Sequence, residues 1–454
     1  MRNIARVAAL AHLALVGCAP RTVEVYVTTG DRSKLLSREP DLSFSAAGTT
    51  LPTIVLDEGT SYQEIVGFGA ALTDASAWLI EHQMSPQRRE ALLQELFGRE
   101  PGLGLSFVRI DMGASDFALR DYSYDDVPPI SNFSIDADRA ETLPILKRAL
   151  AINPRLLIMA SPWSAPGWMK TTGSMIKGTL RPDAYGAYAE YFRRFVDAYA
   201  AEGVPIYAIT AQNEPHFEPA DYPGMRLDPA QRALFVRQYL GPALAGKTRI
   251  LEWDHNWDEP SSPLAVLADS LARRYLSGVA WHCYNGEVSA QSVVHDAYPD
   301  KDAYVTECSG GDWAPKFADN LAWMTRTLII GGTRNWARGV LLWNLALDEQ
   351  HGPHTGGCGN CRGVVTIRSD GTVQRNEEYY ALAHASRFVR PGARRVASSS
   401  AAGGIESAAF RNGDGSRILI VVNINADATT FVVRAGGRAF RYALPAGAVA
   451  TFRF

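Results

Sequence analysis

The chain has 454 residues, of which 46% are hydrophobic and 20% charged, and its formal net charge is -3. These values are typical of a folded protein with one large domain and a smaller one, and they exclude a largely disordered chain. A nucleic-acid groove or a patch for anionic membranes needs clustered lysine and arginine, so we expect no nucleic-acid partner and a neutral substrate.

The first segment of the chain is predicted to direct export. Arg2 and Arg6 precede an apolar run at 7–16, which is too short to span a bilayer and is typical of a signal-peptide core. The run ends in Leu-Val-Gly-Cys, which resembles a bacterial lipobox, so we expect residues 1–18 to be a lipoprotein-type signal with Cys18 lipidated. A chance cysteine in a plain secretory signal is the alternative. Either way we expect a periplasmic or cell-surface protein whose only membrane contact is the lipid on Cys18.

Residues 19–62 and 392–454 are expected to form a β-rich side domain. Both stretches carry short β-branched and apolar runs broken by Gly, Asn and Asp, a pattern typical of antiparallel strands. The clearest hairpin joins 405–411 to 417–423 through an Asn-Gly-Asp-Gly turn. Two β segments at opposite ends of a chain most simply form one domain together.

Between residues 63 and 391, short apolar runs alternate with longer amphipathic stretches, which is typical of repeated βα units around a parallel sheet. The count of units predicts an α/β fold, a (β/α)8 barrel rather than an open doubly wound sheet. The expected strands are 65–72, 105–112, 156–161, 206–212, 249–253, 279–284, 303–307 and 340–344. The expected helices are 86–97, 139–150, 184–201, 229–244, 264–276, 317–330 and 377–389.

Two glutamates stand where predicted barrel strands end. The fourth strand runs into Asn213 and Glu214, and the seventh ends at Glu307. A barrel has its active site at the carboxyl ends of its strands, and two carboxyls across its mouth suit glycoside hydrolysis, with a separation of ~5 Å giving retention. A glutamate after a strand can also be a solvated loop charge. The amide of Asn213, which can hydrogen-bond a sugar hydroxyl, favours the site.

Arg109 lies within the second predicted strand, where a buried charge needs a partner. It is either a structural partner or the cation that keeps Glu307 ionised, and we favour the second role. Other strand ends add polar and aromatic side chains suited to binding a sugar: Asp116, Phe117, Trp163, Trp253, Asp254, His255, His282, Tyr284, Trp343 and Asn344.

Beyond Cys18 the chain has four cysteines, and export permits them to form disulfides. Cys358 and Cys361 have zinc-knuckle spacing, but no second pair accompanies them, so we expect no metal and no other cofactor. A local disulfide or two free thiols are both compatible with the spacing. The other two are Cys283 and Cys308, and we assign no catalytic role to Cys308.

Seven stretches resemble glycoside hydrolase family 30, the clan A group that contains the glucosylceramidases. They are GFGAALTDASA from Gly67, FVRIDMGASDFALRDYSYDD from Phe107, MASPWSAPGWMKTTGSM from Met159, AITAQNEP from Ala208, WHCYNG from Trp281, VTECSG from Val305 and LLWNLALDEQHGP from Leu341. The resemblance covers nearly the whole mature chain. It implies a (β/α)8 barrel with a β-sandwich side domain formed by both chain ends, and hydrolysis with retention.

The resemblance also implies residue roles. Glu214 would be the acid/base, Glu307 the nucleophile and Asn213 the ligand of the 2-hydroxyl. Asp116, Trp163, His282, Tyr284 and Trp343 would line the glucose subsite, with Phe117 and Asn344 beside them.

The sequence specifies the substrate less closely than the catalytic residues. The main expectation is a retaining β-glucosidase of glucosylceramidase type, acting on a glycolipid or β-glucan by double displacement through a covalent glycosyl-enzyme. Segment 351–363 differs from the animal glucosylceramidases and looks more like β-1,6-glucanase-type members, so an endo-β-1,6-glucanase is an alternative, as is a β-xylosidase or β-fucosidase. A surface lipoprotein that binds glycans without cleaving them is disfavoured, because both glutamates are present.

Overall fold

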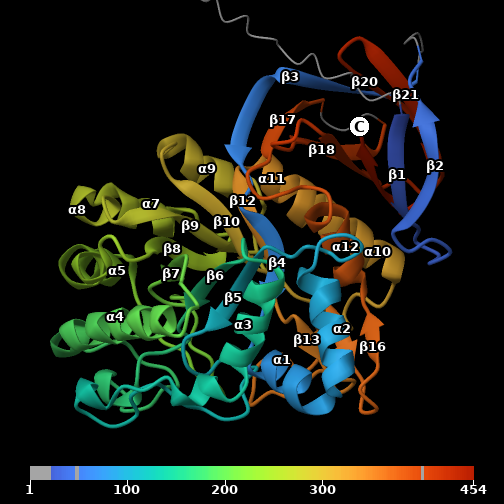
Figure 1. Ribbon diagram of the computed structural model, residues 1–454. Coiled ribbons are helices and arrows are strands. Elements are labelled where there is room, and N and C mark those ends of the chain that lie inside the picture. Colours follow the sequence, from blue (N-terminus) through green and yellow to red (C-terminus); the bar gives the residue numbers. More distant parts are fainter. Residues whose placement is uncertain (1–21, 46–50, 400–402) are drawn as a thin grey trace, which may run out of the picture.

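The computed structural model describes residues 22–45, 51–399 and 403–454, and it consists of a barrel with a β domain beside it (Figure 1). The predicted signal and Cys18 lie outside these residues. The barrel is closed by eight parallel strands in the order β10-β12-β4-β5-β6-β7-β8-β9, which confirms the predicted fold class. The strands are β4 (Gly67–Ala71), β5 (Phe107–Asp111), β6 (Leu157–Ser161), β7 (Ala208–Thr210), β8 (Arg249–Asn256), β9 (Leu276–His282), β10 (Asp302–Glu307) and β12 (Ala337–Leu342).

Helices surround the barrel and bury its outer face (Figure 1). They are α1 (Asp74–Trp78), α2 (Pro86–Phe97), α3 (Thr142–Ile152), α4 (Tyr185–Ala201), α5 (Pro229–Phe235), α6 (Gly241–Leu244), α7 (Ser261–Ala268), α8 (Ser270–Arg273), α9 (Ala290–Ala297), α10 (Phe317–Trp323), α11 (Gly332–Arg334) and α12 (Glu377–Ser386). Aromatic residues recur along α4 at three- and four-residue steps, and this spacing predicts one buried helix face. All of them are buried: Tyr185, Tyr188, Tyr191, Phe192, Phe195 and Tyr199.

Two helical predictions need correction. The predicted helix 264–276 is wrong in its bounds, because α7 ends at Ala268 and Asp269, in extended conformation, caps a separate short α8. The carboxylate of Asp269 accepts hydrogen bonds from the first N–H groups of α8, as an N-cap side chain does. The helices α1 and α9 were not expected at all, because both segments are short.

Both chain ends build the side domain. Its strands form one sheet in the order β2-β1-β22-β19-β18-β17-β3-β20-β21. An isolated bridge between Ser45 and Ala439 joins the two edges of this sheet, so the sheet curls over its own apolar core. The strands are β1 (Thr22–Thr28), β2 (Ser37–Ser43), β3 (Thr53–Glu64), β17 (Arg394–Ser398), β18 (Ile405–Arg411), β19 (Arg417–Asn423), β20 (Thr429–Ala435), β21 (Arg438–Leu444) and β22 (Val449–Arg453).

The strand β3 differs from expectation in its pairing. It runs parallel to β20, whereas turn-rich sequence predicts antiparallel neighbours, because β3 reaches the sheet from the other end of the chain and no hairpin sets its direction. It continues to Glu64 and leads directly into β4 of the barrel (Figure 1). The domain boundary near residue 62 stays a prediction.

Small sheets at the carboxyl end of the barrel connect the loops that carry the site. The strand β11 (Gly310–Gly311) pairs with β14 (Cys361–Arg362), which ties the loop after β10 to the loop after β12. A second sheet joins β13 (Ala346–Leu347), β15 (Val365–Ile367) and β16 (Val373–Arg375). Among the described residues, no helix is long and apolar enough to cross a membrane.

Candidate active site

The two predicted glutamates lie at one cavity of about 440 Å³ at the carboxyl ends of the barrel strands. Glu307 is the last residue of β10, and Glu214 follows β7. Of the other predicted residues, the cavity wall includes Asp116, Trp163, Asn213, Tyr284 and Trp343. The wall also contains residues that were not predicted: Phe217, Pro219, Ala220, Asp221, Tyr222, Trp313, Gly357, Cys358 and Cys361.

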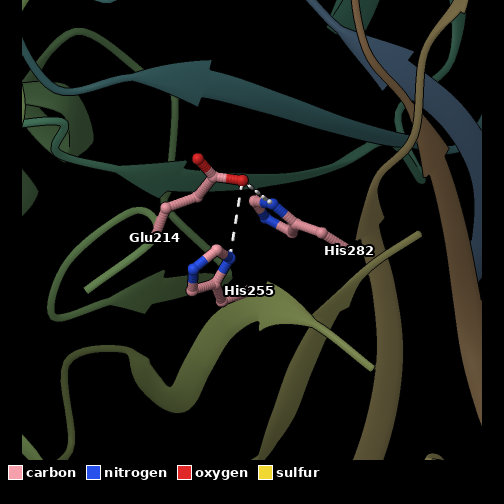
Figure 2. Close-up of side chains that lie close together, drawn as sticks. All are labelled: Glu214, His255 and His282. Carbon is pink, nitrogen blue, oxygen red and sulfur yellow. Dashed lines mark hydrogen bonds and ion pairs between the residues drawn. The ribbon is translucent and has the colours of Figure 1, made fainter. Parts of the chain in front are cut away.

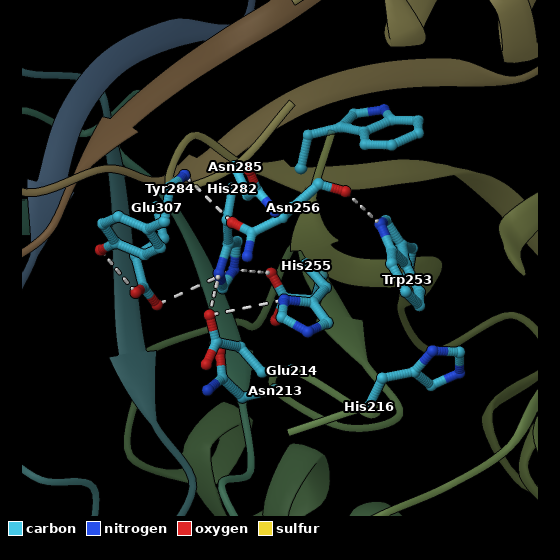
Figure 3. A network of polar contacts seen from close by, with 12 residues as sticks. Asn213, Glu214, His216, Trp253, His255, Asn256, His282, Tyr284, Asn285 and Glu307 are labelled. Carbon is cyan, nitrogen blue, oxygen red and sulfur yellow. Dashed lines mark hydrogen bonds and ion pairs between the residues drawn. The ribbon is translucent and has the colours of Figure 1, made fainter. Parts of the chain in front are cut away.

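Glu307 is held by one hydrogen bond to each oxygen. The guanidinium of Arg109 donates to Oε2 at 2.5 Å. The hydroxyl of Tyr284 donates to Oε1 at 2.8 Å (Figure 3). The structure places Arg109 in contact with Glu307. That Arg109 keeps Glu307 ionised stays a prediction.

Arg109 is fully buried and fixed from several sides. It also donates to Asn213 at 2.7 Å and to Asp254 at 2.8 Å, and it lies 4.8 Å above the ring of Trp163. Burial disfavours its charge, but Asp254 and Glu307 outweigh burial and raise the pKa of Arg109 above its ordinary value. Asn213 is thereby oriented by the same cation that holds Glu307.

Glu214 faces two histidines. Its Oε1 lies 3.1 Å from Nδ1 of His282 and 3.5 Å from Nδ1 of His255 (Figure 2). Burial alone would raise the pKa of Glu214, but the contacts with His255 and His282 lower it to about 2. Burial lowers the pKa of His282, and Glu307, Asp254 and Glu214 outweigh it and raise the pKa to about 9. In the free protein near neutral pH the shared proton therefore resides on His282.

Asp254 is the centre of the network beneath the cavity, and it was assigned only to the rim from the sequence. Its fully buried carboxylate accepts hydrogen bonds from Arg109 and contacts Nε2 of His282 at 3.1 Å. Despite burial, Arg109 and then His282 hold the pKa of Asp254 well below its ordinary value. The remaining donors are hydroxyls on neighbouring strand ends: Ser161, Thr210 and Thr306.

The backbone is bent to bring these groups inward. Trp253 and Asp254 have φ of 76° and 59° at an irregularity in the pairing of β8 with β9, and Glu214 has φ of 47°. Non-glycine residues rarely adopt this left-handed conformation, and they do so mostly where surrounding contacts enforce it. Here the N–H of Glu214 donates to the carbonyl of Asp254 at 3.0 Å, which joins the two bent segments.

The loop at 351–363 closes over Asp116. The N–H of Thr355 donates to the carbonyl of Asp116 at 2.8 Å, and a Cβ at Gly357 would lie 2.6 Å from the Asp116 carboxylate. Burial, followed by the charge of Glu307, raises the pKa of Asp116 well above its ordinary value. Cys358 and Cys361 form a disulfide in this loop, which decides between the two alternatives.

Cys283 and Cys308 form a second disulfide that was not predicted. The two cysteines directly follow the neighbouring strands β9 and β10, so the bond joins the loop of Tyr284 to the end of the strand that carries Glu307. Cysteines at the ends of adjacent parallel strands could have suggested this pairing.

Three predicted substrate ligands do not reach the cavity wall. Phe117, His282 and Asn344 are fully buried, and the cavity lining does not include them. Phe117 contacts the ring of Trp343, and the amide oxygen of Asn344 accepts from the hydroxyl of Thr73. These three residues lie behind the wall, and direct contact with a substrate stays a prediction for them.

One group among the described residues could hold a metal ion by proximity. Glu214, His255 and His282 offer ligand atoms within 4.8 Å of one another (Figure 2). A carboxylate and two imidazoles suit a transition metal such as zinc. A metal at this position would displace the proton of His282, because the same ring nitrogen would have to serve as the ligand.

Comparison with known proteins matches both the barrel and the side domain to models of one family. The model of the glycosyl hydrolase family 30 TIM-barrel domain matches residues 65–389, and that of the family 30 beta sandwich domain matches residues 392–452. Among solved structures, the endo-beta1,6-glucanase BT3312 has a TM-score of 0.89 and 36% identity, covering 95% of this chain and 98% of that chain.

Two relatives show the range of activities in similar proteins. An endo-1,6-beta-D-glucanase of Aspergillus fumigatus is 37% identical over 395 residues, which cover 80% of this chain and 78% of that protein. A putative glucosylceramidase of Caenorhabditis elegans is 32% identical and covers 88% of this chain and 82% of its own length. The motifs, the fold and these matches agree, and this chain is a glycosidase that belongs to glycoside hydrolase family 30.

Proposed function

We propose that the protein cleaves β-1,6-linked glucan within the chain, with retention, using Glu307 as the nucleophile and Glu214 as the acid/base. The observation that supports this most directly is the environment of the pair. Glu307 accepts hydrogen bonds from Arg109 and Tyr284, while Glu214 contacts His282, whose pKa is raised.

In the first step, a carboxylate oxygen of Glu307 attacks the anomeric carbon, and the bond to the leaving oxygen breaks. Glu214 gives that oxygen a proton, which reaches it from His282 through their hydrogen bond. In the second step, Glu214 takes a proton from water, and the water oxygen displaces Glu307 from the sugar. The proton returns to the Glu214 and His282 pair, so the cycle balances.

The neighbouring groups have distinct roles in this proposal. Asn213 and Asp116 line the cavity and hydrogen-bond sugar hydroxyls. The buried rings of Trp163 and Trp343 form its floor, 5.1 Å apart and nearly parallel. Arg109 and Asp254 are positioning residues, because they act on a sugar only through the groups they hold.

The choice of β-1,6-glucan rests on similarity. The relatives named as endo-1,6-β-glucanases are 34% to 37% identical to this chain, and the relatives named as glucosylceramidases are 29% to 32% identical. This ordering favours the glucanase over the glucosylceramidase that the motifs first suggest. Glucosylceramide is the second candidate substrate, because the relatives named as glucosylceramidases align over most of this chain.

The test is a product analysis on β-1,6-glucan and glucosylceramide side by side. We expect oligosaccharides from the glucan and little ceramide from the lipid, and Glu307→Gln should abolish both reactions while leaving the thermal midpoint close to that of the parent. Glu349→Gln is a matched control, since Glu349 is more exposed and lies outside the cavity lining. Faster release of ceramide than of glucan products would transfer the assignment to the glycolipid.

We also propose that the protein is exported and anchored through a lipid on Cys18. The support is the sequence alone: basic residues, a short apolar run and a lipobox-like end.

A further inference from the structure

A second cavity of about 550 Å³ adjoins the catalytic cavity. It is lined by Cys283, Tyr284, Ser309, Trp313, Ala314, Asp319, Asn320 and Trp323. Tyr284 and Trp313 line both cavities, so the two spaces meet across these side chains. Because Tyr284 donates to Glu307, the second cavity begins directly beside the reacting groups.

Two exposed tryptophans form the walls of the second cavity. The side chain of Trp313 is 54% exposed and that of Trp323, at the end of α10, is 42% exposed. Single exposed apolar residues are ordinary, but two indoles at one hollow next to an active site form a patch of the kind that binds ligands.

Trp313 is held in place by a glycine. A Cβ at Gly311 would lie 2.1 Å from the indole ring of Trp313. The ring therefore packs directly on the backbone of Gly311, where any side chain would collide with it. The N–H of Ala314 donates to the carbonyl of Gly311 at 3.0 Å and closes the turn that carries the indole. The indole is thus presented in a fixed orientation, which lowers the entropy lost on binding.

The chemistry of the walls suits a sugar. The flat face of an indole packs against the apolar face of a pyranose ring, and polar side chains nearby bind its hydroxyls. Asp319 provides such a group, since its side chain is 73% exposed and its nearest cation, on Lys316, is 3.9 Å away. An acyl chain would instead have to lie against this carboxylate at a cost in desolvation.

We infer that the second cavity binds glucose units of the glucan on the leaving-group side of the cleaved bond. The buried Trp163 and Trp343 form the floor of the catalytic cavity, whereas Tyr284 and Trp313 stand exposed at its rim. The sugar that is attacked occupies the floor, and its leaving group extends over the rim toward Trp323. This inference rests on the proposed function.

The test compares substrates of different length in the Trp323→Ala variant. Trp323 lines the second cavity and is absent from the lining of the catalytic cavity. We expect kcat/KM for β-1,6-linked oligosaccharides to fall by about 2- to 10-fold once they are long enough to reach it, the range of one aromatic contact. An aryl β-glucoside, whose leaving group ends before Trp323, should be cleaved at the parental rate.

Two further variants separate stacking from a general effect. Trp323→Phe keeps an aromatic face and should retain most of the activity on long substrates. Leu271→Ala removes another exposed apolar side chain, outside the cavity lining, and should change nothing. Parental values for Trp323→Ala at every length would overturn the inference, and so would an equal loss on the aryl glucoside. A loss confined to glucosylceramide would assign the cavity to the lipid and overturn it as well.

Binding measurements keep this test independent of catalysis. In the Glu307→Gln background, calorimetric titration with the same oligosaccharides should show affinity that rises with length, and adding Trp323→Ala should remove that rise. If the parent protein cleaves no β-1,6-linked substrate, the proposed function fails, yet the titration still decides whether the second cavity binds glucan. No dependence of affinity on length would reject the inference alone.

Discussion

Glu214 and Glu307 carry the same side chain in different surroundings. Glu307 lies between a guanidinium and a phenol, while Glu214 lies beside two imidazoles (Figure 3). His282 contacts both carboxylates, at 3.1 Å from Glu214 and 3.8 Å from Glu307. The imidazole of His282 therefore contacts both the proposed acid/base, Glu214, and the proposed nucleophile, Glu307.

Removal of the proton donor should depend on the leaving group. Glu214→Ala should slow hydrolysis of substrates with alkoxide leaving groups by about 100-fold or more, because general acid catalysis contributes about this much. Aryl glycosides with strongly acidic phenols need little proton assistance and should be cleaved in the first step almost as before. Rates on a series of aryl glucosides check this, and an equal loss on all of them would remove Glu214 from the acid role.

The role of His282 should be visible in the pH profile. The pKa of His282 is raised to about 9, so the parent holds the shared proton up to that pH and loses it above. In His282→Asn, Glu214 would hold its own proton only to the lower pKa of a carboxyl, and the alkaline limb of kcat/KM should move toward acid by more than one pH unit. An unshifted limb would contradict this, and His82→Gln, an exposed histidine far from the cavity, is the control.

The sequence predicts the positions of the two glutamates well, since each follows an apolar strand. It does not predict the central role of Asp254, because that role depends on side chains from five other strands that meet only in the closed barrel. For the same reason it does not reveal that His282 lies behind Glu214 rather than at the cavity surface.

At the scale of elements, the loops after β9 and β10 are joined by the disulfide between Cys283 and Cys308. The closed loop spans 25 residues, against a separation of 3 for Cys358 and Cys361. Chain entropy then gives the longer bond about 3 kcal/mol of stabilisation and the shorter about half of that.

Replacing each cysteine pair with alanine tests this difference. Cys283→Ala with Cys308→Ala should lower the free energy of unfolding in denaturant more than Cys358→Ala with Cys361→Ala does. The shorter bond lies in the wall of the catalytic cavity. Its loss should therefore raise KM, while it lowers the free energy of unfolding less than loss of the longer bond does. Equal losses of stability in the two double variants would argue against the entropic account.

The sequence predicts elements best where the signal is local. The hairpin at 405–411 and 417–423 has the predicted bounds, because short apolar runs flank a turn of Asn, Gly and Asp. The segment 264–276 was assigned wrongly, since Asp269 breaks an apolar run that otherwise has helical spacing. The direction of β3 depends on a partner far away in the chain, which no local pattern specifies.

At the scale of the whole molecule, strand β3 connects the side domain to the barrel (Figure 1). The buried His384 of α12 contacts β1 and β22. Both ring nitrogens of His384 lie 2.9 Å from threonine hydroxyls of those strands, and burial lowers its pKa to about 3, so it is neutral. The side domain is therefore expected to unfold together with the barrel.

Export is the prediction that concerns the whole chain. If Cys18 carries a lipid, labelling of cells with a radioactive fatty acid should mark the protein, and Cys18→Ala should release it from the membrane fraction with its activity intact. A soluble, unlabelled parent protein would show that the segment is a plain secretory signal.

The central claim is that Glu307 forms a covalent bond to the sugar. A 2-deoxy-2-fluoro glucoside with a good leaving group slows both steps and lets the glycosyl-enzyme accumulate. Digestion of the trapped protein and mass spectrometry should find the sugar on the peptide at Glu307, with no label in Glu307→Gln. A label on another residue, or none in a protein that turns over the parent substrate, would contradict the assignment.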